Sequence, residues 1–249
     1  MSDQPTVPAR SKATIPVVVA LVAALITGVM LLTPALAGGG SDPSAGAAAE
    51  IDRSGGRPPL DPEDNPFAHI ERRDPEDPAA LGDVDAPVLM VNYSEYQCPF
   101  CGKFARDTKP ELVDEYVEDG TLRIEWRDFP YLGPESITSA KAAWAAGEQG
   151  KFWEYHDAMF EDQQPPNSGK LTDEYLVDKA EQIGLDVDRF REDMTSKAAA
   201  DKVKADFDEG QEIGVTGTPA FLVNGRPIMG AQPTETFVEA VEQAAEEAR

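Results

Sequence analysis

The sequence predicts an α/β domain with an inserted α-helical subdomain, which follows an apolar N-terminal segment and a tether. Three observations support this fold class. A short apolar strand leads directly into a Cys-x-x-Cys turn at 98–101 and a helix, a block of helical character occupies 136–212, and an Asn-Gly hairpin follows it. Strands that alternate with long helical stretches are typical of α/β folds.

The composition limits the possible partners. The chain has 249 residues, enough for one or two domains, and its 46 Asp and Glu against 22 Lys and Arg give a net charge of -24. Phosphate binding needs clustered positive charge, so nucleic acid is not expected as a partner. The excess negative charge is spread along the chain and indicates a soluble, self-repelling surface.

Residues 13–37 contain no charged side chain and follow Arg10 and Lys12. A run of this length can cross the roughly 30 Å of a bilayer core, which favours a single-pass membrane anchor over 13–33 with a cytoplasmic tail at 1–12. The sequence Ala35-Leu36-Ala37 also has the form of a signal cleavage site, so a protein secreted after cleavage near Ala37 is the alternative. Both interpretations place the remainder of the chain outside the cytoplasm.

Residues 38–82 are rich in Gly, Pro and acidic side chains and predict a flexible tether. Its later part, at 65–70, is expected to contact the domain. His69 in this part is interpreted as a loop histidine rather than a ligand or base.

Short apolar runs predict the strands in the first half of the domain. Residues 88–93 predict a strand buried on both faces, and 99–118 predict a helix that Pro110 kinks and Gly120 ends. Residues 122–129 alternate as a second strand, closed by Pro130.

The long middle block predicts five helices, at 137–149, 151–160, 173–183, 186–195 and 197–213, with breaks at 163–169 and Gly184. The aromatic residues of 152–160 are interpreted as core rather than as a cofactor pocket, and His156 among them as a buried core histidine. No metal site is expected, because the acidic and histidine residues show no ligand spacing and two cysteines cannot complete a closed zinc site.

The chain then returns to strand character. Two apolar runs at 220–223 and 226–229 flank Asn224-Gly225, which is a strong hairpin signal. An amphipathic helix is predicted at 234–248.

Cys98 and Cys101 are the only cysteines of the chain. This spacing at the start of a helix brings both sulfurs within bonding distance, and the helix N-terminus stabilises a thiolate on Cys98. Export places the pair in an oxidising compartment, where a disulfide is expected at least part of the time.

The order of these elements resembles the thioredoxin fold with a helical insertion. With the segment Gly-x-Thr-Gly-Thr-Pro at 214–219 directly before the hairpin, the chain resembles the DsbA-like exported thiol-disulfide oxidoreductases over about 84–247. We therefore expect a thioredoxin-like domain over 83–249 with its insertion at about 134–212.

The resemblance implies roles for four residues. Cys98 would be the exposed nucleophile and Cys101 the buried resolving thiol. The Thr218-Pro219 bond would be cis, face the disulfide and turn the Thr218 backbone outward to bind an extended substrate. No cofactor is implied. The implied partners are exported proteins with cysteine pairs and a membrane reoxidase of the DsbB or VKOR kind.

Two positions depart from the family pattern. Phe100 stands between the cysteines where the best-studied oxidants carry histidine, and it cannot donate a hydrogen bond to the thiolate. Asn92 stands where related folds often bury an acid. Pro99, Phe100 and Glu95 are thus the candidates for tuning the redox pair. Glu95 is either an aid to proton transfer or an exposed loop acid.

The leading functional hypothesis is an extracytoplasmic enzyme that oxidises cysteine pairs in exported proteins. The reverse activity, a reductase or isomerase, is the second hypothesis and is motivated by Phe100. A binding or chaperone module with a merely structural Cys98-Cys101 pair is the third.

Overall fold

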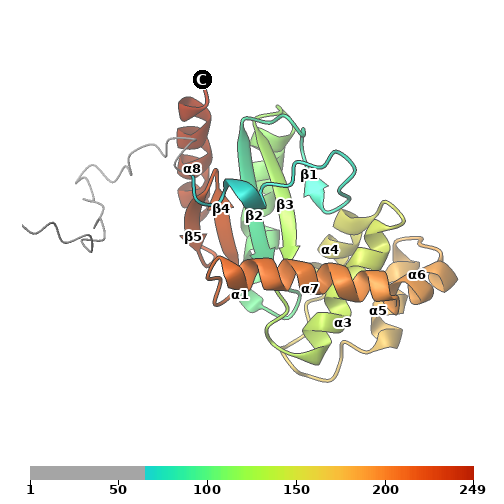
Figure 1. The fold of residues 1–249 in the computed structure, drawn as a ribbon. Coiled ribbons are helices and arrows are strands. Elements are labelled where there is room, and N and C mark those ends of the chain that lie inside the picture. The colour runs from blue at the N-terminus through green and yellow to red at the C-terminus, as the bar shows by residue number, and fades with distance from the viewer. Residues whose placement is uncertain (1–64) are drawn as a thin grey trace, which may run out of the picture. The chain divides into compact units, whose positions relative to one another are not determined.

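The computed structural model describes residues 65–249. Its centre is a five-stranded sheet with the strand order β1-β3-β2-β4-β5 (Figure 1). The strands are β1 (Ala80–Leu81), β2 (Val88–Ser94), β3 (Leu122–Asp128), β4 (Ala220–Val223) and β5 (Arg226–Met229). Strands β2 and β3 are parallel, and the other neighbours are antiparallel.

The two central strands are buried along their whole length, as their continuous apolar character predicts. The predicted hairpin is confirmed: β4 and β5 are joined by Asn224 and Gly225, whose φ angles of 42° and 78° suit a two-residue hairpin turn. The Asn224 side chain also accepts a hydrogen bond of 2.7 Å from the Leu89 amide, which ties the turn to β2.

The predicted helix after the cysteine turn is present, but its turns alternate in type. It comprises α1 (Pro99–Lys103), a π-helical turn (Phe104–Thr108), α2 (Lys109–Leu112) and a second π-helical turn (Val113–Val117). The expected interruption at Pro110 takes this form, with wider turns on both sides of the proline-containing segment. Gly120, with a φ angle of 82°, follows the helix.

Helix α8 (Thr234–Glu247) and the helix that begins with α1 contribute to one core on the sheet. Phe104, Phe221 and Phe237 come from the two helices and β4, and their ring centroids lie 4.5 to 5.1 Å apart. Such close aromatic contacts anchor α1, and with it the cysteine turn, to the sheet.

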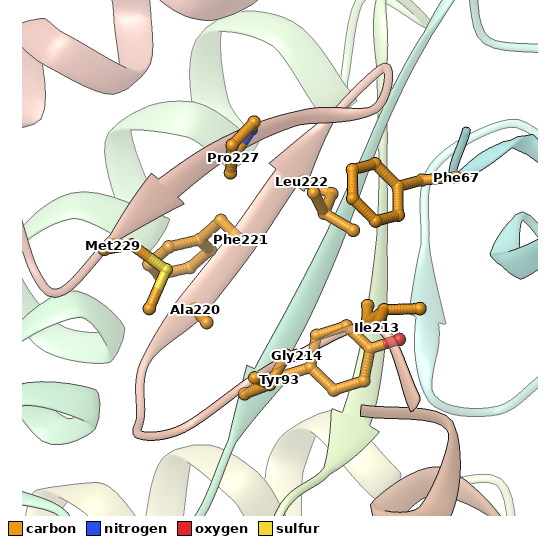
Figure 2. A pocket seen from close by; sticks show the side chains of 10 residues that line it. Phe67, Tyr93, Ile213, Gly214, Ala220, Phe221, Leu222, Pro227 and Met229 are labelled. Carbon is orange, nitrogen blue, oxygen red and sulfur yellow. The ribbon is translucent and has the colours of Figure 1, made fainter. Parts of the chain in front are cut away.

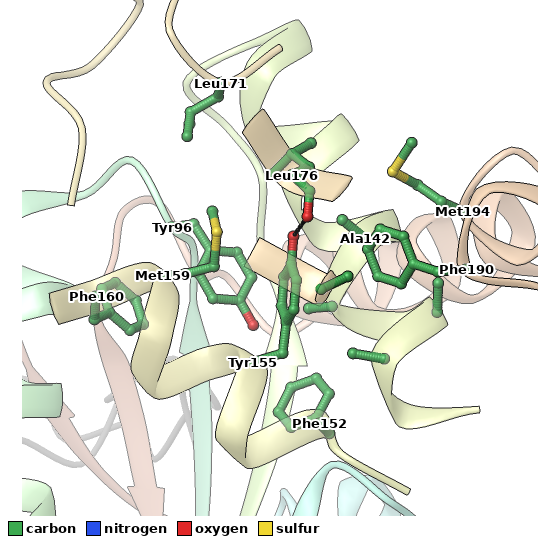
Figure 3. Close-up of a cluster of buried hydrophobic side chains, with 14 of the residues drawn as sticks. Tyr96, Ala142, Phe152, Tyr155, Met159, Phe160, Leu171, Leu176, Phe190 and Met194 are labelled. Carbon is green, nitrogen blue, oxygen red and sulfur yellow. Dashed lines mark hydrogen bonds between the residues drawn. The ribbon is translucent and has the colours of Figure 1, made fainter. Parts of the chain in front are cut away.

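The helical insertion packs around a second apolar cluster, which it shares with Trp126 of β3 and with both cysteines. It consists of α3 (Pro134–Gly147), α4 (Phe152–Glu161), α5 (Asp173–Gln182), α6 (Val187–Met194) and α7 (Lys197–Glu212). Tyr155 lies at the centre of this cluster and its hydroxyl donates to the Leu176 carbonyl oxygen at 3.0 Å (Figure 3). The aromatic residues of α4 are therefore core, as predicted. His156 is 1% exposed, and burial lowers its pKa to about 4.

Helix α7 extends from the insertion to the sheet, on the face that carries Tyr93 (Figure 1). The approach is close at Gly210, where an added Cβ would lie 2.7 Å from the Phe129 ring. Glycine at this position is what permits the helix to lie against the end of β3.

The predicted boundary of the tether at residue 82 is wrong. The contact expected at 65–70 is confirmed, because Ile70 is buried after a turn of 3-10 helix at 68–70. The chain from 71 to 82 also belongs to the domain, since β1 pairs with β3. Arg72 reaches α7, where its guanidinium lies 2.7 Å from Asp206 and 2.9 Å from Glu209. The prediction failed because a Pro-rich and acidic composition is typical of a flexible segment, whereas single residues of this one bind partners far along the chain. His69 is exposed, in agreement with its interpretation as a loop histidine.

Among residues 65–249, no helix is both long and apolar enough to cross a membrane. The segments predicted at 1–12, 13–37 and the first part of the tether lie outside the described residues.

Candidate active site

The cysteine turn lies at the end of β2. Cys98 is the N-cap residue of α1, Pro99 occupies the first turn, and Cys101 lies inside the helix. Proline is favoured in a first helical turn because its missing N–H would have no partner there. Both cysteines are free thiols in this structure.

Cys98 is less accessible than the resemblance implied. The residue is only 2% exposed and Cys101 is 1% exposed, so the expectation of a solvent-exposed Cys98 is wrong. The segment before β4 accounts for this, because the Cys98 thiol donates a hydrogen bond of 3.2 Å to the Thr218 carbonyl oxygen. The Thr218-Pro219 bond is cis, as expected. The Thr218 carbonyl faces the sulfur rather than turning outward.

The two thiols have opposite acidities. The pKa of Cys98 is lowered to about 6, first because the Cys101 thiol donates to its sulfur, while burial opposes this and the N–H groups of Phe100 and Cys101 add to it. The pKa of Cys101 is raised, chiefly by burial. Cys98 is therefore the thiolate of the pair at neutral pH.

Glu95 is buried beside this pair, so the alternative of an exposed loop acid is wrong. It is 2% exposed, and the Ser136 hydroxyl at the start of α3 donates to one of its carboxylate oxygens. The other oxygen has no hydrogen-bond partner. The pKa of Glu95 is raised to about 7, mainly by burial, with the charge of Cys98 acting in the same direction.

Asn92, where related folds often carry an acid, is 3% exposed within β2. By strand alternation its side chain lies on the same face as Val88 and Met90, under α1. Its side-chain oxygen has no hydrogen-bond partner. Glu95, and not position 92, thus supplies the carboxyl group next to the cysteines.

Two glutamines near the cysteines were not anticipated. Gln97 is fully buried and donates to the Ser136 hydroxyl at 2.7 Å. Gln163, in the loop after α4, donates to the carbonyl oxygens of Tyr96 and Cys98 at 3.0 and 2.9 Å. No pattern in the sequence indicates either contact, because they join residues 39 to 67 positions apart through polar side chains without periodicity.

Large apolar side chains are exposed near the site. In the described part of the chain these are Phe100 (63% exposed), Tyr131 (44%), Ile137 (45%) and Met229 (51%). Phe100 lies between the cysteines, and the charge of Cys98 contributes to a raised pKa of Tyr131. Ile137 follows Ser136 on α3, and Met229 pairs with Ala220 next to Pro219. We call these four residues the apolar rim.

An apolar pocket of about 220 Å³ lies along β4 and β5 (Figure 2). Phe67 and Tyr93 lie on one side of it, and Leu222, Pro227 and Met229 lie along the strands. Phe67 belongs to the segment that the sequence assigned to the tether. Met229 belongs to both the pocket and the rim, and Ala220 of the pocket follows the cis bond directly.

The arrangement suits exchange between thiols and disulfides. A thiol of low pKa at a helix N-terminus is both a good nucleophile and a good leaving group, and a buried second thiol of high pKa lies within its reach. A carboxyl group that titrates near pH 7 is available for proton transfer.

Known proteins share this domain. Residues 74–243 match the family described as Thioredoxin. A probable disulfide bond formation protein D from Bacillus anthracis is 32% identical over 150 residues, which are 59% of this chain and 69% of that protein. The crystal structure of a thioredoxin-like oxidoreductase from Silicibacter pomeroyi is 30% identical, with a TM-score of 0.59 over 70% of this chain and 94% of that one.

Two further similarities are more limited. The structure of oxidised BdbD from Bacillus subtilis has a TM-score of 0.64 over 68% of this chain and 92% of that one, and at 24% identity it supports the fold alone. An antiporter, NhaA 1 from Salinispora arenicola, is 36% identical over 173 residues, which are 69% of this chain. The chain spans only 25% of the length of that antiporter.

Proposed function

The chain belongs to the thioredoxin family, as a DsbA-like thiol-disulfide oxidoreductase, and from this premise we propose that it introduces disulfides into exported proteins through Cys98 and Cys101. The opposite acidities of the two thiols are the observation that carries this direction. A pKa of about 6 at Cys98 stabilises the reduced form of the pair as a thiolate. Stabilising the reduced form makes the disulfide a stronger oxidant.

The reaction begins from the disulfide form. A substrate thiolate attacks Cys98 Sγ, the bond between the two cysteines breaks, and Cys101 Sγ leaves with the electron pair. Cys101 then takes up a proton, because its raised pKa favours the thiol. Glu95, with a pKa of about 7, is the candidate donor of that proton.

The second step releases the product. A second substrate thiolate attacks the substrate sulfur of the mixed disulfide, and Cys98 leaves as a thiolate. Its low pKa makes Cys98 the better leaving group. The substrate loses two electrons and gains a disulfide, and the enzyme ends as the dithiol.

The apolar rim and the pocket beside it favour polypeptides as substrates. Unfolded chains expose apolar side chains close to their cysteines, and an apolar surface around a reactive sulfur binds such segments. Thr218 and Pro219 remain the proposed contacts for the substrate, with Pro219 directly before Ala220 of the pocket. A substrate bound there would take the place of the Cys98 thiol at the Thr218 carbonyl oxygen.

The proposal includes an extracytoplasmic location, because the DsbA-like family works there. Residues 13–33 would anchor the enzyme to the membrane, or a signal would be removed near Ala37. Turnover also requires reoxidation of the dithiol, for which we expect a membrane, quinone-linked protein of the DsbB or VKOR kind.

Replacement of single cysteines tests the mechanism. Cys98→Ser should abolish oxidation of a reduced test protein with two cysteines. Cys101→Ser has no disulfide to transfer and should also fail to oxidise the reduced protein. Mixed with the oxidised test protein, its Cys98 thiolate should attack the substrate disulfide and form a mixed disulfide that persists, because position 101 no longer supplies the resolving thiol. Oxidation at the normal rate by Cys98→Ser would refute the proposed role of Cys98.

The reduction potential decides the direction of electron flow. Equilibration with glutathione should give a potential well above the roughly -270 mV of thioredoxin. Phe100 favours the alternative, a reductase or isomerase, because this side chain gives the Cys98 thiolate no donor. A potential near that of thioredoxin would support this alternative. A Cys98 pKa near that of a free thiol, with no turnover of dithiols, would instead indicate a binding module.

A further inference from the structure

We propose that Gln163, in the loop that follows α4, is a positioning residue that holds the Cys98 peptide in the geometry that stabilises the Cys98 thiolate. The proposal rests on the proposed function only in that Cys98 is the nucleophile. It gives the helical insertion a part in tuning the redox pair, in addition to covering it.

The contacts of Gln163 are specific to its amide. The single Nε2 atom donates to the Tyr96 carbonyl oxygen at 3.0 Å and to the Cys98 carbonyl oxygen at 2.9 Å. The NH₂ group offers two donors to two carbonyl oxygens, which neither a carboxylate nor an apolar side chain can do. The Gln163 Oε1 atom faces Arg106, whose guanidinium also donates to the Phe160 carbonyl oxygen at 2.6 Å.

Helix α1 leaves room for this amide at Gly102. A Cβ atom added there would lie 2.1 Å from Gln163 Oε1 and 2.7 Å from the Arg106 guanidinium. Gly102 is buried within the helix and has no unusual φ angle, so backbone conformation does not require glycine here. Its lack of a side chain is explained by the approach of Gln163.

A second glutamine joins the same two segments in the opposite direction. The Asn167 amide donates to Gln97 Oε1 at 2.6 Å, and Gln97 Nε2 donates to the Ser136 hydroxyl. Each segment thus contributes one glutamine side chain that binds the backbone of the other. We call this pair of contacts the glutamine clasp.

The clasp acts on the thiolate through the backbone. Cys98 is the N-cap of α1, and its carbonyl oxygen accepts from both the Gly102 amide at 3.1 Å and Gln163. Fixing this carbonyl fixes the peptide that begins the helix, and thereby directs the Phe100 and Cys101 N–H groups at the Cys98 sulfur. Without Gln163 the turn can relax and these donors lose alignment with the thiolate.

The test compares neighbouring glutamines. Gln164 donates to Asp162 and lies near the Tyr175 hydroxyl, with no contact to residues 95–98 among its hydrogen bonds. Gln163→Leu should raise the pKa of Cys98 by about one, measured by thiolate absorbance against pH. The equilibrium constant with glutathione should shift about tenfold toward the disulfide form of the enzyme, which corresponds to about 30 mV. Gln164→Leu should change neither value.

Gly102→Ala provides an independent approach to the same contact. Its methyl group should displace the Gln163 amide and raise the Cys98 pKa in the otherwise natural protein. In a Gln163→Ala background the Gln163 atoms are gone and the methyl group meets only the Arg106 guanidinium, the far end of a flexible side chain, so it should have little further effect on that pKa. This non-additivity is the signature of a direct contact.

Several results would overturn the inference. One is a Cys98 pKa and glutathione equilibrium unchanged in Gln163→Leu, with thermal unfolding of the oxidised protein confirming that the variant is folded. Equal effects of Gln163→Leu and Gln164→Leu would also overturn it, as would additive effects of Gly102→Ala. Failure of Cys98 as the nucleophile is distinguishable from these results. In that case Cys98 of the natural protein would itself show the pKa of a free thiol.

Discussion

Cys98 combines burial with acidity, and the two usually conflict. Burial alone raises the pKa of a thiol, as it does at Cys101. At Cys98 the donors around the sulfur outweigh burial, first the Cys101 thiol, with the N–H groups of Cys101 and Phe100 at the start of α1 adding to it. The acidity of the nucleophile therefore comes from hydrogen-bond donors of the second thiol and of the local backbone.

Position 100 tests whether a charged side-chain donor next to the sulfur lowers the pKa of Cys98 further. Phe100→His should lower the pKa of Cys98 further, by about one, because a protonated imidazole next to the sulfur favours the thiolate. The equilibrium constant with glutathione should shift about tenfold toward the dithiol form of the enzyme. Phe100→Leu removes the ring without adding a donor and should leave the pKa near 6. A histidine variant with an unchanged thiolate titration would contradict this account.

Glu95 makes stability depend on pH. Its pKa is raised from 4.5 to about 7 in the folded state, so its contribution is fully present below pH 4.5 and is lost as pH rises through 7. Glu95→Gln removes this dependence. The reduced variant should gain stability over the natural protein between pH 4.5 and 8, by on the order of 2–3 kcal/mol in the free energy of unfolding.

Denaturant unfolding of the dithiol form at several pH values would measure this difference. Equal stability curves for both proteins would show that Glu95 ionises normally in the fold.

At the scale of elements, the position of the 65–82 segment depends on Arg72. Its guanidinium is shared by Asp206, which is fully buried, and Glu209 on α7. The Asp206 carboxylate has a second ion-pair partner, Lys202, at 2.6 Å, which remains when Arg72 is replaced. Removal of Arg72 would leave Asp206 incompletely neutralised.

Arg72→Met should therefore destabilise the protein by about 2–3 kcal/mol, measured by urea unfolding. Lys204→Met is the matched control, because Lys204 pairs with Asp208 on the exposed face of the same helix. Exposed pairs of this kind contribute at most about 0.5 kcal/mol. Similar losses in both variants would argue against a special role for the Arg72 contacts.

The elements that the sequence predicts well are those with local signals. Helical periodicity located α3 to α8 within a few residues, and Asn224-Gly225 located the hairpin. Strand β1 has only two residues, which is too short for any pattern. Cys98, Cys101 and Pro219 were also identified from local signals, because each belongs to a short sequence motif. Gln97 and Gln163 did not, because their partners are set by the tertiary fold and an isolated polar residue does not indicate burial.

Glu95 illustrates the same limit within the site. Its position just after a strand is typical of an exposed loop, and its burial depends on α3, whose first turn carries Ser136 more than 40 positions later. The family pattern, which places an acid at position 92, did not help either. Burial of a loop residue by a later helix has no signature in the nearby sequence.

At the scale of the whole chain, the corrected domain boundary can be tested by truncation. A chain that begins at residue 65 retains Phe67, Arg72 and β1, whereas one that begins at 83 lacks all three. The shorter chain should lose several kcal/mol of stability, because β3 loses its edge partner and Asp206 loses Arg72. Thermal unfolding of the two truncated proteins beside the full chain would show this. Equal melting temperatures for the chains that begin at 65 and at 83 would support a domain boundary at residue 82.

The apolar rim has a consequence for product release. A reduced, unfolded chain offers it apolar side chains, but once a new disulfide allows that chain to fold, the same side chains enter its own core. Affinity then falls without any conformational change in the enzyme. Under the proposed function, release of the oxidised substrate would therefore be driven by the folding of the substrate protein itself.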